Sequence, residues 1–368
     1  MRAKPISGIA LPVTACAVRK TAFCPNVHAT PMQRAFITGV SGEILTDEEC
    51  RFVRDTRPAG LILFARNCRE AEQIRTLVAD FKTAAGDDRV LVLIDQEGGR
   101  VQRLKPPLAH KLPPARAFAT MYAAAPEAAV RAAFAVSRLV ASELTALGIN
   151  TNCAPVLDVP CEGAHDVIGD RAYGKDPATI IALGRAAADG LLTGGVLPVV
   201  KHVPGHGRAG ADSHLDLPVV GTAAADLDRT DFVPFRALSD LPAAMTAHVV
   251  FSAIDAGAPA SVSRTVTQKI IREAIGFDGL LMSDDLSMRA LAGSLRSRAE
   301  AVISAGSDLA LHCNGNLAEM REVVEGVPVL VGQALQRLER ARSAMRCSRA
   351  LDVAEAEAAL ELALATVA

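Results

Sequence analysis

LPVVKHVPGHGRAGADSH, residues 197–214, changes character after its sixth residue. The first six residues form a nearly continuous apolar run of strand length, which is typical of a strand whose two faces are both covered. The rest is too rich in proline and glycine for a strand or a helix, so it is predicted to be a loop. The part from Lys201 to His214 holds Lys201, three of the chain's eight histidines and Asp212. Titratable groups on a loop that is held by a rigid scaffold are typical of a catalytic or binding site.

Similar apolar runs recur along the chain from Met32 onward. They lie at 35–39, 60–65, 90–95, 150–158, 243–250, 279–284 and 307–313. Helix-like segments separate them, as at 74–81, where Ile74, Leu77, Val78 and Phe81 share one face. Eight strand–helix units over roughly 310 residues predict an α/β fold, a (β/α)8 TIM-type barrel in a single domain. A doubly wound open sheet is the alternative.

Two regions lie outside this alternation. Residues 1–31 are basic and irregular, and we predict a disordered N-terminal extension before a barrel that spans 32–368. The sequence VTAC at 13–16 faintly resembles a lipoprotein cleavage site, so export is the alternative for this segment. Residues 317–366 are rich in Ala, Glu, Leu and Arg, and are predicted to close the barrel as helices.

The bulk composition excludes several classes of function. The net charge of the 368 residues is -2, without a Lys/Arg run or an acidic tail, so neither nucleic acid nor a membrane is expected as a partner. No apolar run approaches the roughly 18 residues of a membrane span. The eight cysteines form no CxxC pair, which indicates buried thiols in a reducing compartment and predicts a cytoplasmic protein.

Polar segments follow four of the predicted strands. They are DQEGGRVQR (95–103), the segment from Asp158 to Pro177, the loop at 201–214, and SDDLSM (283–288). In a barrel all four lie at the C-terminal mouth, where barrel enzymes keep their active sites. The sequence therefore predicts an active site at this end.

Within these segments the roles of single residues stay open. Only one of Asp284 and Asp285 is expected to point inward, and the other suits a helix cap. Arg103 and Arg171 just past strand ends favour binding of substrate hydroxyls or carboxylates. A metal reading of the histidine loop is weak, because the spacing matches no standard ligand pattern and Lys201 would repel a cation. The chain has no Trp and two Tyr, so it lacks the aromatic side chains on which long saccharides stack. A sugar enzyme of this composition would hold one sugar unit in a polar pocket.

Taken together, KHVPGHGRAGADSH, IDQEGGRVQR, GDRAYGKDP and MSDDLSM resemble the motifs of bacterial β-N-acetylhexosaminidases of glycoside hydrolase family 3. The family pattern is close to KHFPGHG-x4-DSH followed by SDDLSM. The chain departs from it at Val203, where Phe is usual, and at Tyr173, where Phe is common. The resemblance runs from about Phe36 to His312 and does not cover residues 1–31.

The resemblance implies a retaining exo-hydrolase that removes terminal β-linked GlcNAc. Its expected substrate is GlcNAc-1,6-anhydroMurNAc, with or without peptide, from peptidoglycan recycling in the cytoplasm. It implies no cofactor and no metal, and we expect a monomer. The implied roles are Asp284 as nucleophile, His214 as general acid/base paired with Asp212, and Asp95, Arg103, Arg171, Lys201 and His202 as ligands of the sugar.

Three other functions remain open at this point. A phosphorylase would use phosphate in place of water as the acceptor, and a histidine acid/base does not repel phosphate as a carboxylate would. A metal-dependent hydrolase would lose activity to a chelator. A sugar-binding protein without activity should lack one of the catalytic positions, yet all three are present in the sequence.

Overall fold

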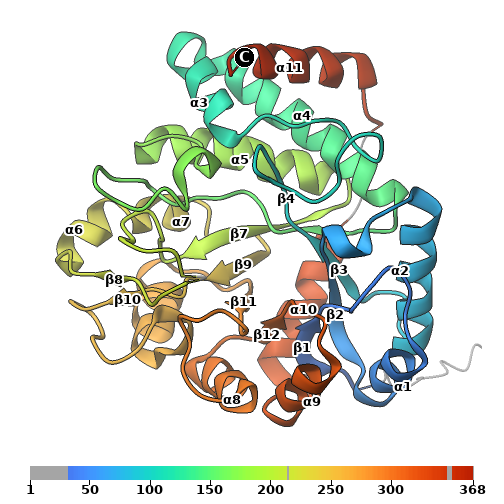
Figure 1. The fold of residues 1–368 in the computed structure, drawn as a ribbon. Coiled ribbons are helices and arrows are strands. Elements are labelled where there is room, and N and C mark those ends of the chain that lie inside the picture. Colours follow the sequence, from blue (N-terminus) through green and yellow to red (C-terminus); the bar gives the residue numbers. More distant parts are fainter. Residues whose placement is uncertain (1–31, 214, 346–349, 368) are drawn as a thin grey trace, which may run out of the picture. The chain divides into compact units, whose positions relative to one another are not determined.

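The computed structural model describes residues 32–213, 215–345 and 350–367 (Figure 1). The predicted extension at 1–31 and the predicted acid/base His214 therefore lie outside the described residues. Within those residues, no helix combines the length and the apolar character needed to cross a lipid bilayer.

In the described part of the chain, eight parallel strands form a closed barrel in the order β1-β12-β11-β9-β7-β6-β3-β2. The strands are β1 (Arg34–Thr38), β2 (Pro58–Leu63), β3 (Leu91–Ile94), β6 (Thr151–Asn152), β7 (Leu197–Val203), β9 (Ala243–Thr246), β11 (Leu280–Asp285) and β12 (Leu309–His312). Each coincides with one of the predicted apolar runs. The predicted (β/α)8 barrel is thus confirmed, and the open sheet is wrong.

The apolar runs arise because helices cover the outside of the barrel and side chains fill its inside. Every residue of β7 is buried, as is every residue of β2, β3 and β12. One strand is much shorter than predicted. The run at 150–158 forms a regular strand only at Thr151–Asn152, because Pro155 has no N–H to donate to a ladder.

The helices surround the strands in Figure 1. They are α1 (Asp47–Thr56), α2 (Ala71–Ala85), α3 (Ala115–Ala124), α4 (Pro126–Ala146), α5 (Pro177–Thr193), α6 (Ala224–Arg229), α7 (Phe232–Ala237), the π-helix η4 (Val266–Ala274), α8 (Leu295–Ala305), α9 (Leu317–Glu325), α10 (Gly332–Ala344) and α11 (Val353–Ala365). The predicted apolar face of α2 is buried and the helix ends at left-handed Gly86. The last helix, α11, packs on α3 and α4.

Short elements lie between the main ones, and several of them stand beyond the strand ends at the mouth. They are the two-stranded pairs β4 (Gln96–Gly98) with β5 (Val101–Gln102) and β8 (Val219–Val220) with β10 (Val250–Phe251), and the 3₁₀ turns η1 (Ala65–Asn67), η2 (Gly169–Arg171) and η3 (Ala260–Val262). The β4–β5 hairpin follows β3 directly, and η2 follows β6.

The barrel closes where β1 meets β12 and β2. The register pairs Phe36 with Ala310 on one side and Ile37 with Gly60 on the other. Just past this seam, the backbone of Gly39 comes so close to β12 that a Cβ there would lie 2.4 Å from the carbonyl oxygen of Cys313. Both partners are backbone, so neither rotates away. A residue without a side chain is required at this position.

We therefore expect Gly39→Ala to lower the free energy of unfolding by about 2–3 kcal/mol, since it forces two strand ends apart in a packed barrel. Gly42→Ala is the matched control, because a Cβ at Gly42 meets no atom within 4 Å, and it should change stability by less than about 0.5 kcal/mol. Urea unfolding of both variants measures the difference. Equal stabilities would show that the seam relaxes without cost.

Candidate active site

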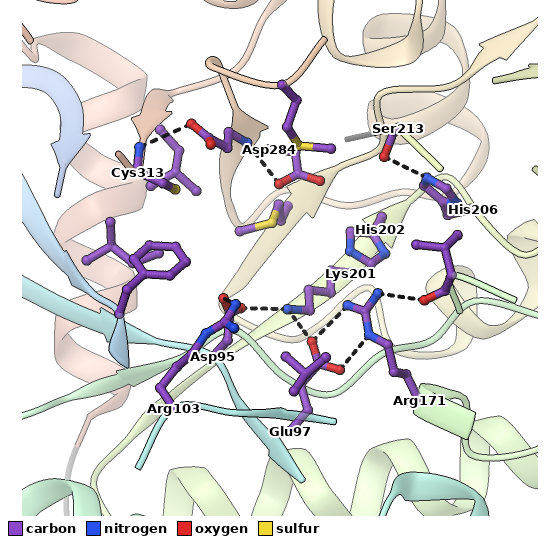
Figure 2. A pocket seen from close by; sticks show the side chains of 18 of the residues that line it. Asp95, Glu97, Arg103, Arg171, Lys201, His202, His206, Ser213, Asp284 and Cys313 are labelled. Atoms are coloured by element: carbon purple, nitrogen blue, oxygen red, sulfur yellow. Dashed lines mark hydrogen bonds and ion pairs between the residues drawn. The ribbon is translucent and has the colours of Figure 1, made fainter. Parts of the chain in front are cut away.

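The C-terminal ends of the strands open into a cavity of 330 Å³ (Figure 2). Side chains from six strands or the residues directly after them line it: Ile62, Asp95, Lys201, Met245, Asp284 and Leu311. Loops add further polar groups, among them Arg171 and His206. The volume lies at the lower end of the range for small-molecule sites. The active site predicted at the barrel mouth therefore has a physical cavity at that place.

Lys201 is the central cation of this cavity. It stands near the end of β7 with its side chain only 3% exposed, and its Nζ lies 2.9 Å from Asp95 Oδ1. Arg103 approaches the other oxygen of the same carboxylate, with Nη2 2.8 Å from Asp95 Oδ2. Burial raises the pKa of the Asp95 carboxyl, but Lys201 and Arg103 outweigh burial and hold that pKa below its usual range. Asp95 is thus an ionised acceptor held between two donors.

Glu97 completes the network and was missed by the sequence analysis. Its Oε1 lies 2.7 Å from Lys201 Nζ, and its carboxylate accepts two 2.8 Å hydrogen bonds from Arg171. The spacing of two residues from Asp95 in DQEGG was the available signal. Burial raises the Glu97 pKa, and Lys201 and Arg171 more than offset this, so the pKa is lowered. Glu97, which had not been singled out, therefore joins Arg171 to the group of Asp95, Arg103 and Lys201.

His202 is held by a second buried carboxylate that the sequence analysis also missed. Its Nδ1 lies 2.7 Å from Asp158 Oδ2, and Asp158 Oδ1 accepts the backbone N–H groups of His202 and His206. Burial raises the pKa of Asp158, but His202 and His206 lower it by more than burial raises it. The pKa is therefore below its usual range, and the group is ionised. An ionised carboxylate only accepts, so Nδ1 of His202 carries the hydrogen. The ring is fixed in one orientation, with His202 lining the cavity.

The two consecutive aspartates have different surroundings. Asp285 accepts the backbone N–H groups of Cys313 and Ser287 at 3.1 Å each, and also the Ser287 hydroxyl. Its carboxylate therefore joins β11 to the end of β12. The Asp284 carboxylate accepts the backbone N–H of Asp285 at 2.8 Å and lies opposite the chain of Asp95, Lys201 and Glu97 in Figure 2. Asp284 is the carboxylate that faces the charged network. Asp285 also lines the cavity, and the helix cap expected of it is wrong, because the next helix is capped by Ser294.

The electrostatic surroundings of Asp284 favour its ionised form. Burial raises the pKa of this carboxyl, but the attraction of His248, His202 and Lys201 and the N–H of Asp285 together lower it. The group is thus an anion at neutral pH, ready to act as a nucleophile or to stabilise positive charge. His248 itself is buried between Ser261 Oγ at 2.6 Å and the carbonyl of Asp285 at 3.0 Å.

His206 is buried beside the cavity. Its Nε2 lies 3.1 Å from Ser213 Oγ, whereas its Nδ1 is buried with no hydrogen-bond partner among the described residues. Burial, helped by the neighbouring His202, lowers the His206 pKa to about 4. The ring is therefore neutral at physiological pH and ties Ser213 to the end of β7.

The predicted pair Asp212 and His214 is described only in part. Asp212 lines a second cavity of 430 Å³, which shares Val101, Val167 and Arg171 with the first. His214 lies outside the described residues. Among the residues that are described, no three of the His, Cys, Asp and Glu side chains gather closely enough to hold a metal ion.

The sequence has well-defined relatives. Residues 36–343 match the glycosyl hydrolase family 3 N terminal domain. The chain is 41% identical over 279 residues to a beta-hexosaminidase of Thiobacillus denitrificans, covering 75% of this chain and 77% of the relative. It is 38% identical over 335 residues to a beta-hexosaminidase of Alkalilimnicola ehrlichii, covering 85% of this chain and 95% of the relative.

Solved structures agree with these matches. Native NagZ from Neisseria gonorrhoeae has a TM-score of 0.80 and 33% sequence identity, and the match covers 92% of this chain and 98% of that one. A glycoside hydrolase family 3 β-N-acetylglucosaminidase from Paenibacillus has a TM-score of 0.79 and 29% identity, covering 90% of this chain and 66% of that one.

The buried His206 predicts a pH dependence of stability. Its pKa is about 4 in the folded chain and near 6.5 when unfolded, so the folded chain binds fewer protons between these values. The free energy of unfolding should therefore fall as the pH drops from about 6.5 to 4, with up to about 3 kcal/mol from this residue. In His206→Gln the fall should be shallower. Urea unfolding at several pH values measures the free energy of unfolding for both proteins. The same pH dependence in the parent chain and in the variant would contradict a buried, neutral His206.

Proposed function

The chain belongs to glycosyl hydrolase family 3 and is a glycoside hydrolase, and on that premise we propose that it is a retaining exo-β-N-acetylglucosaminidase. The observation that carries the proposal is Asp284, an ionised carboxylate facing a small cavity whose other side is a network of paired donors and acceptors. Relatives named beta-hexosaminidase and β-N-acetylglucosaminidase support the choice of sugar.

Asp284 is proposed as the nucleophile. In a retaining hydrolase one carboxylate attacks the anomeric carbon and forms a covalent glycosyl-enzyme, which water then hydrolyses. Attack requires an ionised group, and the lowered pKa of Asp284 meets this requirement at neutral pH. Asp285 is unsuited to the role, because both of its carboxylate oxygens already accept hydrogen bonds from the β11 and β12 ends.

Proton transfer to the leaving group requires a different kind of residue. Asp95, Glu97 and Asp284 all have lowered pKa values, so none of them holds a proton to give. Histidine titrates near neutrality and can serve as acid and then as base. His202 is held by Asp158 and His206 is neutral. We therefore assign the acid/base role to His214, paired with Asp212, on the strength of the DSH motif.

The remaining groups are proposed to bind the sugar. Asp95 offers acceptor oxygens, while Arg103, Arg171, Lys201 and His202 offer donors to the hydroxyls and the acetamido group. Asp95, Glu97 and Asp158 already hold these donors in place. Sugar binding therefore costs little side-chain entropy. A cavity of 330 Å³ suits a single terminal residue, which is the basis for exo action.

The natural substrate is proposed to be GlcNAc-1,6-anhydroMurNAc, with or without peptide, in the peptidoglycan recycling of the cytoplasm. The enzyme is proposed to work as a monomer without a cofactor. The substrate, its pathway and the absence of a cofactor follow from the motif resemblance, whereas the names of the relatives support a beta-hexosaminidase activity.

The purified protein should hydrolyse an aryl β-N-acetylglucosaminide with a kcat/KM at least about 100-fold above that for the matching aryl β-glucoside, since the pocket is proposed to bind the acetamido group. Proton NMR should show the β-anomer of GlcNAc first. The same assay with added phosphate should yield no sugar 1-phosphate. A first-formed α-anomer would contradict the retaining route, and sugar 1-phosphate would identify a phosphorylase.

Asp284→Asn should lower kcat by roughly 10³-fold or more, because the amide cannot form the glycosyl-enzyme. A 2-fluoro or 5-fluoro sugar should trap the covalent intermediate, and mass spectrometry should find the label on Asp284. A cooperative urea unfolding transition is the control that the Asn variant is folded. A label on Asp285 would overturn the assignment.

A further inference from the structure

The loop after β6 carries Arg171 into the cavity, although it contains little regular structure of its own. Residues 161–168 are irregular, and the turn η2 ends at Arg171. Main-chain carbonyl groups outside a helix or a strand need hydrogen-bond donors from elsewhere. Three arginine side chains supply these donors.

Arg100 supplies most of them. The carbonyl oxygens of Asp166, Val167 and Ile168 all lie within hydrogen-bonding distance of its Nη2, the last two at 3.0 and 3.2 Å, and share the two hydrogens of that nitrogen. Its Nε lies 3.2 Å from the Asp170 carboxylate, whose Oδ1 is buried. Arg116 adds a 2.8 Å hydrogen bond from Nη2 to the carbonyl of Gly169. A single guanidinium thus fixes several consecutive carbonyl groups just before Arg171.

The carbonyl oxygen of Val167 links this clamp to the cavity directly. It accepts from Arg100 at 3.0 Å and from Arg171 Nη1 at 3.1 Å. Arg171 in turn makes its two hydrogen bonds to Glu97, which contacts Lys201. The Val167 carbonyl is therefore an acceptor shared by the Arg100 and Arg171 guanidinium groups.

The same loop also supports the loop after β7. The backbone N–H of Cys161 donates to the carbonyl of Gly207 at 3.3 Å, and that of His165 donates to Ala209 at 2.9 Å. The contact is close, since a Cβ at Gly207 would lie 2.0 Å from the carbonyl oxygen of Val159. These contacts involve residues 159–165, which precede the carbonyl groups that Arg100 holds.

We propose that Arg100 is a positioning residue of the active site: its guanidinium clamps residues 166–168 so that Arg171 is aimed at the sugar. Arg100 itself lies outside the residues that line the main cavity, and its side chain is 43% exposed. An exposed arginine that served only solubility would not converge on three carbonyls of one loop. The inference rests on the proposed function, because sugar binding by Arg171 is its readout.

The test is a double-mutant cycle with an aryl β-N-acetylglucosaminide. Arg100→Ala should raise KM about tenfold while kcat changes by less than about threefold, because only binding geometry is lost. Arg171→Ala should raise KM at least as much. The double variant should match Arg171→Ala within about twofold, since Arg100 acts through Arg171. An unchanged KM in Arg100→Ala, or a further tenfold rise in the double variant, would overturn the proposal.

Two further variants keep the result interpretable. Arg340→Ala is the matched control, because Arg340 is also a partly exposed arginine that donates to a backbone carbonyl, that of Asp278, before the start of β11 at the opposite end of the barrel. It should leave KM unchanged. Arg100→Lys keeps the charge but not the planar fork, so it should give an intermediate KM. It replaces Arg100→Ala in the cycle if that variant does not fold.

Amide hydrogen exchange of the full-length protein separates this proposal from the proposed function. Residues 161–171 should exchange faster in Arg100→Ala than in the parent chain and in Arg340→Ala. If the parent chain does not turn over the aryl substrate, the proposed function fails, and the exchange still tests the clamp. If the parent chain is active but exchange in this loop is unchanged, the clamp is wrong.

Discussion

The positions of the charged residues at the barrel mouth depend on one buried ammonium group, that of Lys201 near the end of β7. Removing the Lys201 charge from water costs several kcal/mol unless opposite charges compensate for it. The carboxylates of Asp95 and Glu97 do so at 2.9 and 2.7 Å. They come from the residues after β3, so the ammonium joins two segments of the barrel that are more than one hundred residues apart in sequence. The shape of the cavity depends on this contact.

Each carboxylate needs a second cation, because a buried anion with one partner still has unsatisfied lone pairs. Arg103 serves Asp95 and Arg171 serves Glu97. The result is three cations and two carboxylates in contact, with Asp284 as the third anion opposite them. The set is balanced only while all members are present. Removing one partner of a buried pair is costly because the other charge stays behind without compensation, so binding groups and scaffold are here the same atoms.

The sequence could predict the barrel because its signals are local. Each strand is an apolar run. Because both faces of the strand are buried, apolar and polar residues do not alternate along it as they do in a half-exposed strand. The end of the strand then fixes the mouth position of Lys201 or Asp284. Glu97 and Asp158 could not be found in this way. Their partners lie 74 and 44 residues further along the chain, and such pairings depend on barrel register. Likewise, only the contacts with Cys313 and Ser287 distinguish Asp285 from Asp284.

The charge set also restricts which residue can handle the proton. A carboxylic acid can donate a proton at neutral pH only if its surroundings raise its pKa, as burial in an apolar pocket does. In this cavity the opposite holds. Lys201 with Arg103 or Arg171 lowers the pKa values of Asp95 and Glu97, and chiefly His248 and His202 lower the pKa of Asp284, although burial raises all three. An acid/base group for this cavity must therefore be one whose charged form is the protonated one. Histidine meets this requirement, and this is the physical reason for the proposal that His214 carries the proton.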